Sequence, residues 1–92
     1  LKFNILKHSS SSYIRIEVKD VPGVLSSITE VFSKYKISIK NLIQNPEKKK
    51  RKATIIIITH KSLEKNFNSL FKSLIKNKYI LKKPTFIRIE KF

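Results

Sequence analysis

The 92 residues of this chain are enough for one domain with a single hydrophobic core. Cysteine is absent, so disulfides, thiolate nucleophiles and thiolate metal sites are excluded. The formal charge of +15 would suit nucleic acid, but the 21 basic residues are scattered over every segment and almost all are lysine, whereas base recognition relies on arginine. We therefore expect a solvated basic surface and no nucleic-acid partner.

The chain shows no sign of membrane insertion or secretion. No apolar run is long enough to cross a membrane, and no cleavage signal follows the first apolar residues. These patterns predict a cytoplasmic domain without a membrane partner. Methionine is also absent, although a newly made chain needs one to start, so we expect a piece of a longer protein.

The first twelve residues predict a lead-in and linker from a preceding domain, and residues 13–92 predict one folded domain. Ser9 to Ser12 form a four-serine stretch that is typical of a flexible linker. Residues 13–19 then alternate between apolar and polar side chains, which predicts a half-buried strand. Its core-facing residues would be Ile14, Ile16 and Val18.

The next segments change their period twice. Apolar residues recur at three- and four-residue steps from Val24 to about Tyr35, which predicts an amphipathic helix. Residues 37–44 predict a second strand, with a β-bulge near Lys40 and Asn41 where its apolar residues change parity. Residues 45–52 (NPEKKKRK) predict an exposed, solvated hairpin connection.

The second half of the chain repeats this alternation of element types. Residues 53–60 hold four consecutive isoleucines, which predicts a central strand whose second face is covered by another subunit. A second amphipathic helix follows, with Ser62 as its predicted cap, and residues 85–90 predict a last strand with Ile87 and Ile89 facing inward. The apolar positions of this helix are Leu63, Phe67, Leu70, Phe71, Leu74 and Ile75.

The order strand, helix, strand, strand, helix, strand predicts an α+β fold, the ferredoxin-like βαββαβ sandwich. This sandwich has a four-stranded antiparallel sheet with two helices on one face, and its first and third strands are central. Pairing Ile16 with Ile89 would bring opposite charges together on the outer face, which favours that register by up to ~1 kcal/mol. The predicted charge pairs are Arg15 with Glu90 and Glu17 with Arg88.

Catalytic chemistry finds little support in these residues. The two histidines, His8 and His60, have no carboxylate pair or cysteine near them, and a single glycine excludes a glycine-rich phosphate loop. We predict no catalytic residue, no metal site and no cofactor in this domain. RNA-binding modules share the predicted topology, but they stack bases on aromatic residues of the central strands, and residues 53–60 contain none.

The stretch DVPGVL, residues 20–25, follows the first predicted strand and holds the only glycine. It matches the D-x-P-G-V-L signature of the ACT family, whose members are small-molecule regulatory domains attached to enzymes of amino-acid metabolism. Together with ISIKNLIQ (37–44), ATIIIITH (53–60) and KPTFIRIE (83–90), it is similar to the C-terminal ACT domain of bacterial homoserine dehydrogenases. This resemblance covers residues 12–90.

The resemblance implies a regulatory fragment of an enzyme that reduces aspartate semialdehyde to homoserine with NAD(P)H, in the biosynthesis of threonine and methionine. It implies feedback control by an amino acid, with L-threonine as the effector, and a homodimer formed through the ACT domain. The catalytic region and its NAD(P) would belong to the N-terminal part of that enzyme. The predicted effector-binding residues are Asp20, Val21, Pro22, Gly23, Val24, Leu25, Asn41 and Gln44.

The chemistry of these residues fits an amino-acid ligand. Backbone N–H groups at the start of the predicted helix suit a carboxylate. Asp20 would either cap that helix or attract the ligand's ammonium, and the amides of Asn41 and Gln44 would either bind the ligand or simply face solvent. Family members usually have glycine where Lys36 stands, so Lys36 must adopt a left-handed conformation or change the turn.

Two other functions stay open from the sequence. The domain could serve only as a dimer interface, with a ligand site that is no longer used. It could also bind RNA through its basic surface, which a salt-dependent gel shift would reveal.

Overall fold

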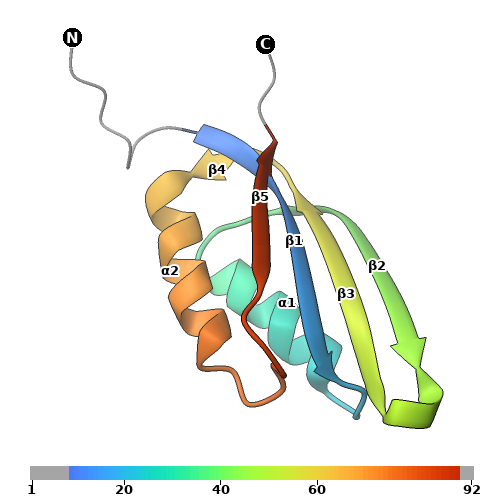
Figure 1. The fold of residues 1–92 in the computed structure, drawn as a ribbon. Coiled ribbons are helices and arrows are strands. Elements are labelled where there is room, and N and C mark those ends of the chain that lie inside the picture. The colour runs from blue at the N-terminus through green and yellow to red at the C-terminus, as the bar shows by residue number, and fades with distance from the viewer. Residues whose placement is uncertain (1–8, 90–92) are drawn as a thin grey trace, which may run out of the picture.

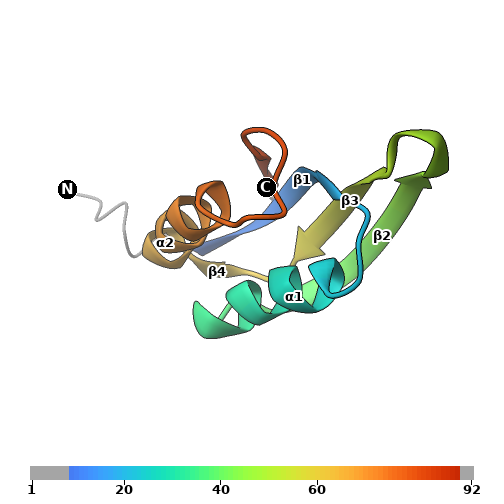
Figure 2. The same ribbon diagram turned by 90° about the horizontal axis from the view of Figure 1, so that it is seen from below.

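The structure, a computed structural model, describes residues 9–89. Two helices lie on one face of an antiparallel sheet, and the hairpin at one end of the sheet projects beyond them (Figure 1; Figure 2). The elements are β1 (Ser9–Lys19), α1 (Val24–Lys34), β2 (Ile39–Glu47), the 3-10 turn η2 (Lys48–Lys50), β3 (Lys52–Thr59), β4 (Ser62–Leu63), α2 (Glu64–Ile75) and β5 (Thr85–Ile89).

The central strand of the sheet is β1. It pairs antiparallel with β3 on one side and with β5 on the other, and β2 lies at the edge beside β3. The two-residue strand β4 pairs with the start of β1. The predicted ferredoxin-like topology is therefore confirmed, with one short strand added.

The core lies between the sheet and the helices because each element has one apolar face. Alternate residues of β1 and β3 point toward the helices. Helix residues at three- and four-residue spacing pack against them. Each fully buried Ile, Leu or Phe contributes about 1.5–3 kcal/mol to stability. The core residues are Ile14, Ile16, Val18, Val24, Ile28, Phe32, Ile37, Ala53, Ile55, Ile57, Phe67, Leu70 and Leu74.

The four serines are part of the sheet, so the prediction of a flexible linker at Ser9 to Ser12 is wrong. They form the first four residues of β1, and both Ser10 and Ser12 are buried. The backbone N–H of Ser12 donates to Oγ1 of Thr59 at 3.0 Å. Small polar side chains fit here because the period-two pattern of β1 continues through them. The lead-in, residues 1–8, lies outside the described residues, and its assignment to a preceding domain stays a prediction.

The register between β1 and β5 differs from the prediction by five residues. Ile87 lies opposite Tyr13, and Phe86 lies opposite Ile14. An odd shift reverses the faces of a strand, so Phe86 packs inward while Ile87 and Ile89 point away from the helices. Their inward placement was therefore predicted wrongly.

The cause of this shift lies just before β5. Ile80 forms a β-bridge with Val18, and the backbone N–H of Leu81 donates to the carbonyl oxygen of Glu17 at 2.9 Å. This connection occupies the last residues of β1, so β5 can pair only with residues before them.

The predicted charge ladder across β1 and β5 is not formed by the described residues. Arg88 pairs with Glu64 of α2, and Glu17 pairs with Lys82 at 2.8 Å. Arg15 lies opposite Thr85. These pairs connect the sheet to α2 and to the loop before β5. The prediction considered only the two facing strands, so it could not include these partners. Glu90 is outside the described residues.

Strand β2 and its two connections bear out some predictions and correct others. The expected bulge is present as a register shift between Ile39 and Asn41. Strand β2 then continues through Pro46, so the basic connection is shorter than predicted, and it ends in Arg51 with a left-handed φ of 52°. Lys36 also adopts a left-handed conformation, with a φ of 60°, as one of its two expected options.

The start of α2 is also different from the prediction. Ser62 belongs to β4 and does not cap the helix. The N-cap residue is Leu63, whose backbone is extended, and no side chain caps this end. The first turn instead contains the buried Glu64.

Candidate functional site

The connection between β1 and α1, residues 20–23, is the candidate site, and we call it the β1–α1 loop. Gly23 is the N-cap residue of α1 and has a φ of 88°, in the left-handed region. L-residues reach this region only at a cost, whereas glycine does so readily. A Cβ atom at Gly23 would lie 3.6 Å from the Tyr79 hydroxyl, an ordinary contact. The backbone conformation, and not lack of space, therefore requires glycine here.

The start of α1 is open. None of the described side chains makes a capping hydrogen bond there, and the first turn has no acidic residue. The first regular helical bond runs from the N–H of Ser27 to the carbonyl oxygen of Gly23 at 3.0 Å, and the N–H of Val24 makes only a long 3.3 Å contact with Val21. The N–H groups before Ser27 thus lack helical partners and carry the positive end of the helix dipole. The interpretation of Asp20 as a helix cap is not supported by this geometry.

Backbone hydrogen bonds fix the β1–α1 loop from two sides. On the side of the β2–β3 hairpin, the N–H of Asp20 donates to the carbonyl oxygen of Arg51 at 2.9 Å. On the side of the α2–β5 connection, the N–H of Lys19 donates to the carbonyl oxygen of Tyr79 at 2.9 Å. The loop is therefore positioned by two connections that are distant from it in sequence.

A side-chain bridge holds the second of these connections against α1. Nδ2 of Asn77 donates to Oγ of Ser27 at 3.0 Å, and Oδ1 of Asn77 accepts from the N–H of Tyr79 at 2.9 Å. The hydroxyl of Tyr79 is thereby placed beside Gly23. One asparagine thus ties the α2–β5 connection to the first turns of α1.

The predicted loop residues differ in what they can offer a ligand. Asp20, Val21, Pro22 and Gly23 are exposed. Val24 is buried in the core, so only its backbone faces the site, and Leu25 is half-buried against the core. Asp20 belongs to none of the ion pairs formed within residues 9–89. Its carboxylate is free to meet a cationic group.

The two predicted amides on β2 are not brought together. Gln44 lies opposite Ile55, on the face covered by the helices, whereas Asn41 lies opposite Ile58, on the other face. Both side chains are exposed, and both belong to an edge strand. Because β3 separates β2 from the strand that leads into the β1–α1 loop, the two amides cannot join the loop as one cluster within a single chain.

The surroundings of the loop are basic. Lys19 lies directly opposite Lys52 in the β1–β3 pair, and the backbone of Arg51 is bonded to the loop. Glu47, which is opposite Lys52 on the other side, pairs with Lys50 at 4.0 Å. An anionic group would find more cations than carboxylates at this end of the sheet.

Sequence reasoning missed the residues of the α2–β5 connection and the role of the Arg51 backbone. Asn77 lies fifty positions from Ser27, which it contacts, and both Asn77 and Tyr79 belong to a stretch with neither strand nor helix periodicity. An asparagine just after a helix is a common turn signal, but it does not indicate which distant group the amide will meet. No pattern in the sequence predicted this contact.

The described part of the chain offers no other centre of chemistry. Residues 9–89 contain no group of three His, Cys, Asp or Glu side chains that could hold a metal ion. Within the same range no helix has the length and apolar character needed to span a bilayer. His60 is exposed, and His8 lies outside this range.

Comparisons of sequence place the chain among known proteins. The model of the ACT domain family matches residues 12–77, more than two thirds of the chain. Homoserine dehydrogenase of Methylobacillus glycogenes is 36% identical over 83 residues, which cover 89% of this chain and 20% of that protein. The enzyme of Neisseria gonorrhoeae is 34% identical over 82 residues, which cover 89% of this chain and 19% of that protein. The chain therefore spans about one fifth of these relatives.

Comparisons of structure agree. The crystal structure of a homoserine dehydrogenase from Thiobacillus denitrificans matches with a TM-score of 0.82 at 30% identity, covering 96% of this chain and 19% of that chain. The ACT domain from the GTP pyrophosphokinase of Chlorobium tepidum matches with a TM-score of 0.70 at 21% identity, covering 87% of this chain and 100% of that domain. This second likeness concerns the fold alone. The resemblance predicted from residues 12–90 is confirmed.

Proposed function

This chain belongs to the ACT domain family, and from that premise we propose that it is the regulatory domain of a homoserine dehydrogenase with L-threonine as its effector. The identity to homoserine dehydrogenases over nearly the whole chain supports this parent enzyme. Reduction of aspartate semialdehyde with NAD(P)H would take place in the catalytic region of that enzyme, in the cytoplasm. The residues described here would regulate the reaction without taking part in it.

The observation that carries this proposal is the open start of α1. Gly23 leaves the first N–H groups uncovered, and no side chain within residues 9–89 caps them. An α-carboxylate would accept hydrogen bonds from these groups and meet the positive end of the helix dipole. The unpaired carboxylate of Asp20 would attract the α-ammonium group, so the two charges of a bound amino acid would each have a partner.

We propose a homodimer that completes this site. Strand β2 is an edge of the sheet, and Asn41 and Gln44 are both exposed along it. A second copy placed against this edge would present one of these amides to the β1–α1 loop of its neighbour. This arrangement supports a role for one of the two residues, although they cannot join the loop within one chain.

Isothermal titration calorimetry of the 92-residue chain with L-threonine tests the proposal. We expect saturable binding, with a stoichiometry of one ligand per chain or one per dimer. L-valine, which replaces the hydroxyl by a methyl group, serves as the matched ligand. If neither L-threonine nor L-valine binds, an effector site is contradicted.

A second function is favoured by the uncovered face of the sheet. Ile43 is 51% exposed and Ile87 is 54% exposed, and Ile56 and Ile58 between them are half-buried. An apolar face of this kind suits a subunit interface that needs no ligand. Sedimentation that shows a stable dimer, together with no binding of any amino acid, would favour this purely structural module. The RNA-binding alternative gains no aromatic platform on β3 from the structure.

A further inference from the structure

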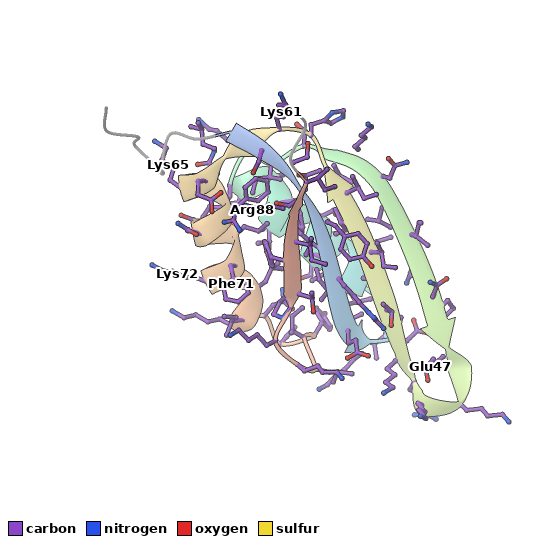
Figure 3. All side chains as sticks on the ribbon, turned by 45° about the horizontal axis from the view of Figure 1, so that its top comes forward. Glu47, Lys61, Lys65, Phe71, Lys72 and Arg88 are labelled. Carbon is purple, nitrogen blue, oxygen red and sulfur yellow. The ribbon has the colours of Figure 1, made fainter. Side chains whose placement is uncertain are left out.

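A groove lies between α2 and β5, away from the β1–α1 loop, and we call it the α2–β5 groove. Its volume is about 320 Å³. Figure 3 shows Phe71 and Arg88 between the helix and the strand, whereas Lys65 and Lys72 extend outward from α2. The groove is lined by Phe67, Asn68, Phe71, Lys72, Phe86 and Arg88.

Aromatic rings form the floor of this groove. Phe71 and Phe86 make an edge-to-face contact, with ring centroids 5.1 Å apart and an interplanar angle of 79°. Both rings are only half-buried, whereas Phe67 beneath them is almost completely buried. Ile75, one helical turn beyond Phe71, is 50% exposed and extends the apolar surface along α2. An apolar side chain would therefore find ring surface that the domain itself leaves uncovered.

Cations border the groove on both sides. Lys72 stands on the helix side, and Nζ of Lys83 lies 5.8 Å from the centroid of the Phe71 ring on the strand side. Neither lysine forms an ion pair with another residue of the described range. Lys65 lies two helical turns before Lys72 and adds to the charge of that helix face.

The nearby carboxylate does not neutralise these lysines. Glu64 is buried, and it accepts a hydrogen bond from Nε of Arg88 at 2.8 Å and pairs with the same guanidinium. Glu64 and Arg88 therefore neutralise each other, and the charge left at the rim of the groove is positive. A second copy of this chain, with 21 basic and 6 acidic residues, would offer this rim few carboxylates compared with an acidic segment.

We propose that the α2–β5 groove docks an acidic peptide segment of a partner protein. One large apolar side chain of the segment packs against Phe71 and Phe86, and carboxylates on either side of it face Lys72 and Lys83. The apolar floor supplies the anchor, and the charges at the rim select acidic sequences over basic ones. This interaction is independent of amino-acid binding at the β1–α1 loop.

The test is a nuclear magnetic resonance titration of the ¹⁵N-labelled chain with three synthetic peptides. The probe peptide has a central phenylalanine and leucine flanked on each side by three glutamates. One matched peptide carries lysines in place of the glutamates, and the other carries glycine and serine in place of the apolar pair. We expect saturable shifts at Phe71, Lys72 and Phe86 with the probe, no saturation with the basic peptide, and binding at least about tenfold weaker without the apolar pair.

A pair of charge reversals locates the binding surface. Lys72→Glu should weaken binding of the probe about five- to tenfold, because an attraction of an exposed ion pair becomes a repulsion. Lys49→Glu in the β2–β3 connection makes the same change in net charge and should alter binding less than about twofold. Both lysines are exposed, and unchanged spectra elsewhere would show that the variants fold.

Four results would overturn the proposal. The two variants could weaken binding equally, or the shifts could spread over the β2–β3 hairpin as well as the groove, and either result would indicate unspecific attraction of polyanions. Groove resonances could also move with protein concentration in the absence of peptide, which would make a second copy the occupant. No binding of the probe by the unmodified chain would exclude an acidic peptide directly.

Discussion

The two helices begin in opposite ways, although both pack on the same sheet. At the start of α2 the first turn contains Glu64, which is only 7% exposed and pairs with Arg88 of β5. At the start of α1 the first turn has no acidic residue, no side chain forms a cap, and the N-cap is the exposed Gly23. Neither start has a cap from a described side chain, but the first turn of α2 contains a carboxylate in an ion pair, whereas the first turn of α1 contains none.

This contrast supports the proposed binding site at the start of α1. A carboxylate at a helix N-terminus is stabilising because it meets the positive end of the dipole. Helix α2 receives this carboxylate from its own sequence, whereas α1 does not, and its open start coincides with the family signature DVPGVL. The contrast therefore supports the proposal that α1, unlike α2, receives its carboxylate from a bound ligand.

The largest expected effect comes from removing the carboxylate at the start of α2. Glu64→Gln should lower the free energy of unfolding by about 2 kcal/mol, because it removes the charge partner of Arg88 at a buried position. Arg88 is partly exposed, which keeps the loss below that of a fully buried pair. Urea denaturation measures the change. Glu30→Gln, at an exposed position of α1, is the matched control, and an equal loss in both variants would contradict the contrast.

Altering the open start should have the next largest effect. Gly23→Ala forces an L-residue to a φ of 88°, which should cost about 1 kcal/mol of stability. The new methyl group would also lie beside the first N–H groups of α1 and should weaken binding of L-threonine. Thermal denaturation and calorimetry measure the two effects. A variant that is destabilised but binds normally would show that Gly23 serves only the backbone.

Replacing a left-handed residue by glycine at the end of α1 should have a smaller effect on stability. Lys36 has a φ of 60°, so Lys36→Gly should relieve strain and raise stability by about 0.5 kcal/mol, after the greater freedom of glycine in the unfolded chain is subtracted. Chemical denaturation measures the gain. Ligand affinity should not change, because Lys36 lies at the other end of the helix from the β1–α1 loop. Reduced stability would show that the greater freedom of glycine in the unfolded chain outweighs the relief of left-handed strain.

The smallest effect on stability is expected at Asp20. No side chain caps α1, so Asp20→Ala should change the free energy of unfolding by less than about 0.5 kcal/mol. The affinity of the Asp20→Ala variant for L-threonine should nevertheless fall, because the carboxylate that pairs with the ligand's ammonium group is lost. Calorimetry beside a thermal melt separates the two roles. A clear loss of stability with unchanged affinity would restore the capping interpretation.

Local patterns predicted the elements well. Residues 20–25 predicted where β1 ends and α1 begins, and the change of apolar parity near Lys40 predicted the bulge in β2. These features depend on the conformations of neighbouring residues, which the sequence records directly. The topology followed because few arrangements join such elements with right-handed connections.

Long-range choices could not be predicted in the same way. Alternation in residues 85–90 is compatible with several registers, and the observed register depends on Ile80 occupying the end of β1. The contacts of Asn77 with Ser27 and of Glu64 with Arg88 join segments that share no pattern. For this reason the loop of the candidate site was predicted, but its supporting residues were found only in the structure.

Pro46 limits what can be added to the free edge of the sheet. It lies in β2, opposite Ala53, and proline has no N–H to donate. An added strand could hydrogen-bond with β2 over residues 39–45, but it would lose a donor at Pro46 and meet a cluster of lysines beyond it. The edge therefore permits a short pairing of two copies while it resists open-ended growth into fibrils.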